Sequence, residues 1–310
     1  MTKYKYNNAL HRPKTVLALQ GGGAHGAFTW GALDQLLEDG LEFDAVTGVS
    51  SGAITGSLAV QGMVKAGTEG ARQAIRQLWT MVMEGNVLNT LPASPFDWMF
   101  DITKNLGNDF AWSGLTQALR LFDPASLNPL GQNPLEPLLQ QLLDPRLLGA
   151  PEAPRLYVGA TDVETGEATI FANDQINVST LLASACLPMM FPTIKINGRA
   201  YWDGGYSCNP PLTPVLTPQP DRLILIRAQP RQRNFIPTST ADIVHRLHEI
   251  AFQAPLAAEL SMLPKQIELF DISADQALAQ HPLNSKLNTD RPFLEYLFKA
   301  GRQAASGLLK

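Results

Sequence analysis

The sequence predicts an α/β fold: a three-layer α/β/α sandwich with a mostly parallel central sheet and a helical insertion. Short apolar runs alternate with helical patterns, and the runs at 15–19 and 222–226 are almost wholly apolar, which is typical of parallel strands buried on both faces. A strand, a Gly-x-Ser-x-Gly turn and a helix of small residues across 43–64 are a second indication. The block at about 66–150 breaks this alternation, so we interpret it as the insertion.

The composition indicates a globular protein with a large core. The chain has 310 residues, of which 45% are apolar and 17% are charged. A formal net charge of −4 without a basic run gives no sign of nucleic-acid binding. Cys186 and Cys208 have neither a disulfide-framework nor a metal-ligand spacing, so we expect them to stay reduced. Residues 1–14 do not resemble a signal peptide, and no run is long and apolar enough for a membrane span. We therefore expect a cytoplasmic protein, at most peripheral to the membrane, that needs no metal or cofactor.

The predicted alternation of strands and helices begins with a strand at 15–19, which leads into a glycine loop at 20–26. A helix with apolar residues at helical spacing follows and is expected to end at Gly40. The second strand is expected at 43–47. After the turn, the helix at 53–64 starts with small residues, which allows it to pack tightly on the sheet.

Residues 66–150 contain a predicted amphipathic helix at 72–83 and an apolar helix at 135–148. Between them, 91–130 mixes Pro and Gly with many large apolar side chains. Two compatible interpretations remain open. The block packs on the core as a helical insertion, or it forms an apolar cap that lines an acyl-chain pocket.

The βαβ pattern resumes after the insertion, and the hairpin within it has the Asn197-Gly198 signature of a type I′ turn. The predicted elements are strands at 155–160 and 167–171, a helix at 178–186, hairpin strands at 193–196 and 199–202, a strand at 222–226, a helix at 241–262, a strand at 266–272 and a helix at 293–309.

The turn around Ser50 has the pattern of a nucleophile elbow. Gly48 and Gly52 lack a Cβ, so the strand and the helix can cross closely while the serine takes a strained conformation. Ser50 then projects at the helix N-terminus, where free backbone N–H groups can face a developing negative charge. Ser50 is therefore the candidate nucleophile.

The glycine loop fits two patterns. Gly21-x-Gly23-x-x-Gly26 after a strand satisfies the dinucleotide-binding pattern, which also needs an acidic residue at the end of the second strand. Asp44 lies at the start of that strand instead, and the elbow occupies its end. An oxyanion hole is the better interpretation, because consecutive glycines can turn their N–H groups outward and approach an ester carbonyl closely.

A serine nucleophile needs a base, and none of the five histidines has a convincing local setting. Asp203 does: it leaves a predicted strand, and Gly204 and Gly205 after it suggest close backbone approach. A carboxylate can serve if it is desolvated and if the hole stabilises the alkoxide as it forms. The histidines are His11 in the N-terminal tail, His25 in the glycine loop, His245 and His248 on one predicted helix, and His281, the only one late enough for a Ser–Asp–His order.

Together these residues resemble the patatin-like phospholipases, whose catalytic core is related to that of cytosolic phospholipase A2. The resemblance covers about 15–210 in four blocks: Gly21-Gly22-Gly23-Ala24-His25-Gly26, Gly48-Val49-Ser50-Ser51-Gly52, Ala183-Ser184-Ala185-Cys186-Leu187-Pro188-Met189-Met190-Phe191-Pro192 and Asp203-Gly204-Gly205. It implies a Ser50–Asp203 dyad without histidine. It also implies an oxyanion hole from the glycine block, to which we add the Ser51 N–H. Many members carry Arg or Lys at the position of His25.

The resemblance assigns 15–210 to a patatin-like catalytic core that includes the insertion, and we assign 211–310 to the completion of the same domain. Gly26, Gly48, Gly52, Gly204 and Gly205 support the motifs.

The function that this implies is a lipid acyl hydrolase working through an acyl-enzyme. The expected partners are a lipid ester substrate and, transiently, a membrane surface, with no nucleic acid. Two alternatives stay open: an esterase or depolymerase for short hydroxyacyl esters, which a narrow, polar pocket would favour, and a membrane-associated regulatory protein with a vestigial site. If 91–130 forms an acyl-chain pocket, shortening Trp98, Phe100 or Trp112 should weaken long-chain substrates most.

Overall fold

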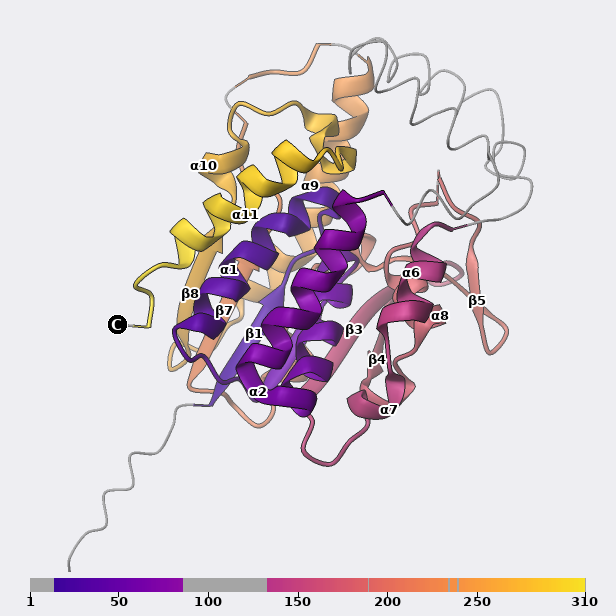
Figure 1. The fold of residues 1–310 in the computed structure, drawn as a ribbon. Coiled ribbons are helices and arrows are strands. Elements are labelled where there is room, and N and C mark those ends of the chain that lie inside the picture. Colours follow the sequence, from indigo (N-terminus) through magenta and orange to yellow (C-terminus); the bar gives the residue numbers. More distant parts are fainter. Residues whose placement is uncertain (1–13, 86–132, 189, 234, 239, 310) are drawn as a thin grey trace, which may run out of the picture.

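The computed structural model describes residues 14–85 and 133–309, except for positions 189, 234 and 239. A mixed sheet in the order β5-β6-β3-β2-β1-β7-β8, with β4 also paired to β3, crosses this part of the molecule (Figure 1). The strands are β1 (Thr15–Leu19), β2 (Ala45–Gly48), β3 (Arg155–Asp162), β4 (Ala168–Ala172), β5 (Ile194–Ile196), β6 (Arg199–Asp203), β7 (Arg222–Arg227) and β8 (Glu268–Ser273).

The centre of the sheet is parallel, as predicted. β3, β2, β1, β7 and β8 pair in parallel, whereas β4 and β6 run antiparallel to β3, and β5 pairs antiparallel with β6. Asn197 and Gly198 both have positive φ, so the hairpin between β5 and β6 turns as the sequence predicts. Because β1, β2 and β7 are parallel neighbours, the loops after them meet at one edge of the sheet.

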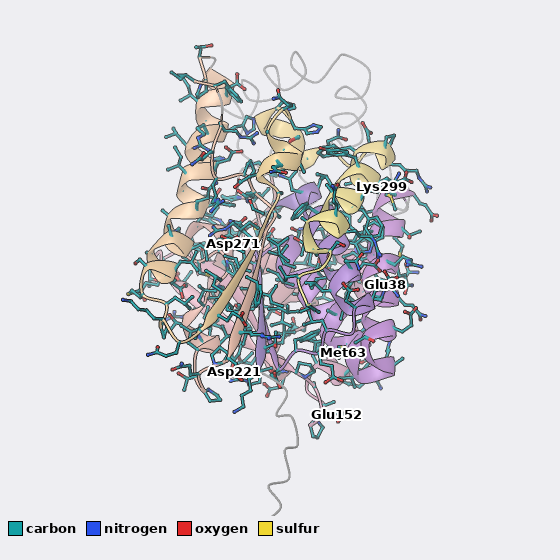
Figure 2. All side chains as sticks on the ribbon, turned by 90° about the vertical axis from the view of Figure 1, so that its left-hand side faces the viewer. Glu38, Met63, Glu152, Asp221, Asp271 and Lys299 are labelled. Carbon is teal, nitrogen blue, oxygen red and sulfur yellow. The ribbon has the colours of Figure 1, made fainter. Side chains whose placement is uncertain are left out.

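Helices cover both faces of the sheet, which gives the predicted three layers. In the side view, Glu38, Met63 and Lys299 of α1, α2 and α11 lie on one side of the sheet and α9 on the other (Figure 2). The helices are α1 (Gly26–Glu38), α2 (Ser51–Met83), α6 (Leu135–Leu142), α7 (Pro145–Leu148), α8 (Val178–Ser184), α9 (Thr240–Ser261), α10 (Asp275–Leu278) and α11 (Arg291–Ala305), with short 3₁₀ turns that include η1 (Gly23–His25), η3 (Gly204–Tyr206) and η5 (Leu283–Leu287).

β1 shows why both faces need a cover. Leu17 and Leu19 belong to the larger core under α1, α2 and α11, whereas Val16 and Ala18 belong to the smaller core under α9. All four side chains are almost fully buried, because alternate residues of a strand point to opposite faces.

The structure divides two predicted helical segments differently from the sequence prediction. The separate helices at 53–64 and 72–83 are the two halves of α2, which turns sharply at Ala66 and Gly67, where both residues are non-helical. The single helix predicted at 135–148 is wrong. Leu143 is extended, and α7 starts afresh at Pro145, because proline is tolerated in the first turn of a helix but not in its interior.

The C-terminal hundred residues complete the same sheet and core. β7 pairs with β1, β8 extends the sheet beyond it, and Phe293, Leu294 and Leu297 of α11 are buried in the core against α1. The buried carboxylate of Asp34 on α1 pairs with guanidinium groups from both α2 and α11. Residues 86–132, and with them the predictions made for 91–130, lie outside the described residues. Within the described ranges, no helix is long and apolar enough to cross a membrane.

Candidate active site

Ser50 lies between β2 and α2 in a strained conformation, with φ 54° and ψ −127°. A Cβ on Gly48 would lie 2.8 Å from the backbone nitrogen of Ala53, and a Cβ on Gly52 would overlap the carbonyl oxygen of Leu19. Strand and helix can therefore cross this closely only because both positions are glycine, as the sequence predicts.

A second serine holds the backbone of Ser50 in place. The hydroxyl of Ser184, at the end of α8, accepts a hydrogen bond from the Ser50 N–H at 2.9 Å. It donates to the carbonyl oxygen of Gly159 in β3 at 2.7 Å. The elbow is thus tied to the neighbouring strand from its side, which helps to maintain the strained conformation.

Asp203 ends β6 and is 2% exposed. Its Oδ1 accepts the Gly205 N–H at 2.8 Å, and the Ser50 hydroxyl lies close enough to its carboxylate to lower the pKa of Asp203. Burial raises the pKa of Asp203 to about 6, although the Gly205 N–H, the Ser50 hydroxyl and the charge of Lys286 each pull that pKa down. A Cβ on Gly204 would overlap a backbone carbonyl of β3, so the close approach predicted after the aspartate is present.

The histidines lie apart from this pair. In the described part of the chain, no hydrogen bond joins a histidine to Ser50 or to Asp203. His25 is buried and its Nε2 lies 2.9 Å from the Ser285 hydroxyl, while His281 packs against two aromatic rings of α11. Burial lowers the pKa of His25 to about 3, so this residue is neutral at pH 7 and adds no charge to the glycine loop.

Of the N–H groups predicted to form the oxyanion hole, only some are free of other acceptors. The Gly21 N–H donates to Asn209 Oδ1 at 2.9 Å, and the Gly22 N–H donates to Ser51 Oγ at 3.1 Å, so both already have acceptors. Among the described residues, no hydrogen bond engages the N–H of Gly23 or that of Ser51. Both of these residues line the same cavity.

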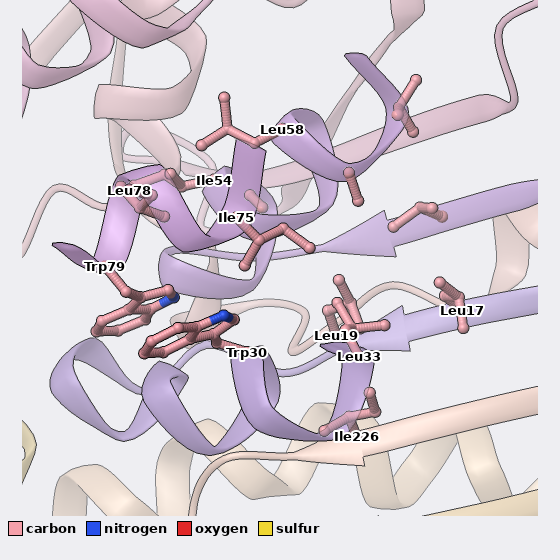
Figure 3. Close-up of a cluster of buried hydrophobic side chains, with 14 of the residues drawn as sticks. Leu17, Leu19, Trp30, Leu33, Ile54, Leu58, Ile75, Leu78, Trp79 and Ile226 are labelled. Carbon is pink, nitrogen blue, oxygen red and sulfur yellow. The ribbon is translucent and has the colours of Figure 1, made fainter. Parts of the chain in front are cut away.

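An apolar cavity of about 220 Å³ lies beside Ser50. Ile54, Leu78 and Trp79 of α2 line it and come together in the buried cluster of Figure 3. Leu138 of α6 contributes from the far end of the insertion. The ends of the block that the sequence marks as an insertion therefore do line a cavity at the candidate nucleophile.

We predict that Gly23→Ala strongly reduces activity. Gly23 has φ 58°, and a Cβ there would lie 2.5 Å from the Lys286 carbonyl oxygen, so η1 and η5 must separate and the Gly23 N–H must move. We expect kcat on a soluble ester to fall at least about tenfold. Gly40→Ala is the matched control: Gly40 has φ 86° but no atom within 4 Å of its Cβ position. It should lose about 1 kcal/mol of stability and keep its activity. Equal activity losses in the two variants would contradict the steric argument.

Sequence reasoning did not single out three residues of this site. Ser184 lies in a motif block but had no role there, and Asn209, which holds Gly21, had none either. Lys286 lines the cavity from η5, about 235 positions after Ser50, and nothing in its local sequence suggests this.

In the described ranges, no cluster of His, Cys, Asp and Glu could hold a metal ion.

Comparison with known proteins identifies the family. The patatin-like phospholipase family model matches residues 17–216, which include the elbow, the glycine loop and Asp203. This chain belongs to the patatin-like phospholipase family. Family membership indicates lipid hydrolysis at the level of the family.

Solved structures similar to this patatin-like chain are larger proteins. VipD from Legionella pneumophila is 17% identical with a TM-score of 0.46, and the matched region covers 96% of this chain and 66% of VipD. The type III effector protein ExoU is 17% identical with a TM-score of 0.36, covering 96% of this chain and 53% of ExoU. ExoU in complex with SpcU, from the type III secretion system of Pseudomonas aeruginosa, is 14% identical with a TM-score of 0.32, covering 95% and 53%. This chain therefore spans about half to two thirds of their length, and a search of curated protein sequences gives no match.

Proposed function

We propose that this protein is an acyl hydrolase of lipid esters that acts through a Ser50–Asp203 dyad. The observation that carries the proposal is the placement of the Ser50 hydroxyl next to the buried carboxylate of Asp203, beside an apolar cavity of about 220 Å³. A nucleophile next to a base, with free N–H groups nearby, is the arrangement that acyl transfer requires.

The reaction proceeds in two steps. Ser50 Oγ attacks the ester carbonyl carbon while Asp203 takes the hydroxyl proton, and the N–H groups of Gly23 and Ser51 hold the oxyanion. When the tetrahedral intermediate collapses, the alcohol leaves with the proton from Asp203. Water then attacks the acyl-enzyme, giving its proton to Asp203. As the second tetrahedral intermediate collapses, Asp203 returns a proton to Ser50 Oγ and the fatty acid is released.

The lining of the cavity supports long acyl chains over short hydroxyacyl esters, which would favour a polar pocket. Apart from Ser51 beside the nucleophile, its side chains from α2 and α6 are aliphatic or aromatic. The vestigial alternative is weakened because Ser50 and Asp203 are both present and lie close together. Because lipid esters reside in membranes or droplets, the proposal includes a transient contact with a lipid surface.

Two measurements test the proposal together. A fluorophosphonate probe should label wild-type protein at Ser50, and lipidomics of mixed phospholipids and neutral lipids should show released fatty acids. Labelling without release of fatty acid from any lipid would leave a serine hydrolase but overturn the lipid assignment. Absence of labelling in folded protein would support the vestigial alternative.

We predict that Val82→Phe shortens the acyl chains that the enzyme accepts. Val82 lines the cavity from α2 and is half-buried at the edge of the larger core, so a larger ring there can extend into the cavity. Each excluded methylene removes about 0.8 kcal/mol of transfer free energy, so kcat/KM should fall roughly tenfold for every two methylenes excluded. A panel of p-nitrophenyl esters from four to sixteen carbons measures this, with Val82→Ala as the control that widens the cavity. Equal losses at all lengths would mean that Val82 does not contact the chain.

A further inference from the structure

Lys286 is the one charged residue among the described residues that line the apolar cavity. It belongs to η5, a short turn far from the motifs in sequence, and it shares the cavity wall with Gly23, Ser50 and Ser51. An ammonium group in apolar surroundings is costly unless an anion compensates it, so a lysine on this wall calls for an explanation.

The fold holds η5 firmly against the glycine loop. The Ser285 hydroxyl lies 2.9 Å from His25 Nε2, and the Lys286 carbonyl oxygen packs so closely on Gly23 that only glycine fits. On the other side, the guanidinium of Arg233 donates to the carbonyl oxygens of Leu278 and His281, just before η5. The backbone of Lys286 is therefore positioned by contacts on two sides.

No carboxylate in the described part of the chain lies within ion-pair distance of Lys286. Two acids attract it from farther away, Glu249 and Asp203. Glu249 already pairs with Arg233 at 2.5 Å and with Arg246 at 2.9 Å, which offsets most of its charge. Burial lowers the pKa of Lys286, and the two acids oppose that effect. Among the described residues, Lys286 thus has no close ionic partner, while its charge acts on the base Asp203.

We propose that Lys286 supplies the positive charge of the oxyanion site, stabilising the negative charge that develops on the substrate oxygen when Ser50 attacks. The glycine loop has no cation of its own, because its only basic residue, His25, is buried, neutral and bonded to Ser285. The same charge also favours the ionised form of the base, Asp203. The inference rests on the proposed nucleophile but does not depend on which ester is the substrate.

The alternative role for such a lysine is to bind an anionic head group. Its place on the wall beside the nucleophile and the free N–H groups favours the oxyanion. The two roles differ in what they predict. If Lys286 stabilises the oxyanion, removing its charge lowers kcat on every ester, including neutral ones. If it binds head groups, removing its charge raises KM for anionic lipids only.

The test is the rate at which diisopropyl fluorophosphate, a neutral probe, modifies Ser50. Ser50 Oγ forms a bond to phosphorus, the P–F bond breaks, fluoride leaves, and Asp203 takes the proton. Lys286→Met should slow this labelling by about 10²-fold. It should also lower kcat on p-nitrophenyl butyrate by about 10²-fold, with KM almost unchanged. Lys299→Met, an exposed lysine of α11 shown in Figure 2, is the control and should label at the wild-type rate.

A pH profile of the labelling rate provides a second readout. The charged and titratable groups that interact with Lys286 are Asp203, Glu249, His25, His245 and His248. Removing the charge of Lys286 should raise the pKa of Asp203, so the acid limb should move to higher pH, whereas a purely structural loss would lower the rate without moving that limb.

Lys286→Gln, which is also neutral but keeps a polar end, should behave like Lys286→Met. Wild-type labelling rates in both variants, or a loss seen only as a higher KM on phosphatidylglycerol vesicles, would overturn the inference. Wild-type protein that labels readily but hydrolyses no lipid would instead overturn the proposed function, and the labelling rates would still decide the role of Lys286.

Discussion

Replacing Ser50 by alanine is expected to abolish ester hydrolysis, with a loss of about 10⁵-fold in kcat, because no other group can form the acyl-enzyme. The fold should persist, since the Gly48 and Gly52 crossing and the bond from the Ser50 N–H to Ser184 do not involve the hydroxyl. Activity on p-nitrophenyl esters, fluorophosphonate labelling and circular dichroism on the same sample measure this.

The neighbouring serine is the matched control. Ser51→Ala keeps the Ser51 N–H but removes the hydroxyl that accepts the Gly22 N–H, so the glycine loop loses one anchor. We therefore expect a moderate loss, far smaller than that of Ser50→Ala. If Ser51→Ala were inactive and unlabelled while Ser50→Ala still reacted, the assignment of the nucleophile would be wrong.

Asp203→Asn is expected to have the second-largest effect, up to about 10⁴-fold, approaching the level of Ser50→Ala. The amide keeps the size of the side chain and can still accept the Gly205 N–H, but it cannot take the Ser50 proton. Single replacements of His245, His248 and His281 should have modest effects. If a folded histidine variant were as inactive as Asp203→Asn, the site would be a triad and the dyad assignment would be wrong.

The pH profile of activity distinguishes an aspartate base from a histidine base, and burial reverses the order of pKa values that exposed side chains would have. An exposed aspartate would stay ionised far below pH 6, whereas burial raises the pKa of Asp203 to about 6, so activity should fall as the pH drops through about 6. Burial moves the histidines in the opposite direction, lowering the pKa of His245 to about 4 and that of His281 below its usual value. An acid limb near pH 6 is therefore expected for Asp203, one near pH 4 would contradict it, and an unchanged limb in the His281 variant excludes that histidine as its source.

The same burial makes a prediction for stability. The folded-state pKa of Asp203 lies above its unfolded value, so this group destabilises the fold as the pH rises from about 4 to about 6, and fully above that. Two pKa units correspond to about 2–3 kcal/mol. Asp203→Asn should therefore raise the free energy of unfolding by up to that amount at pH 7.5 and by little at pH 4. Urea unfolding at both pH values tests this, and a less stable variant at pH 7.5 would contradict it.

The sequence by itself determined the layered α/β fold, the elbow around Ser50 and the candidacy of Asp203. Each depends on local chemistry: buried strands require apolar runs, a tight strand–helix crossing requires Gly48 and Gly52, and close approach after an acid requires small residues. Residues that are close in sequence meet these requirements, so the amino-acid sequence alone is enough to predict them. The helix predicted across 135–148 failed because Leu143 and Pro145 break it within an otherwise apolar stretch.

The tertiary structure alone decided which N–H groups remain free and which charge faces the cavity. Asn209 occupies the Gly21 N–H from 188 positions away, and Ser51 occupies that of Gly22. Lys286 reaches the cavity because η5 packs on the glycine loop through His25 and Ser285. Contacts between residues so distant in sequence leave no local pattern, and the desolvation that raises the pKa of Asp203 depends on everything packed around that carboxylate.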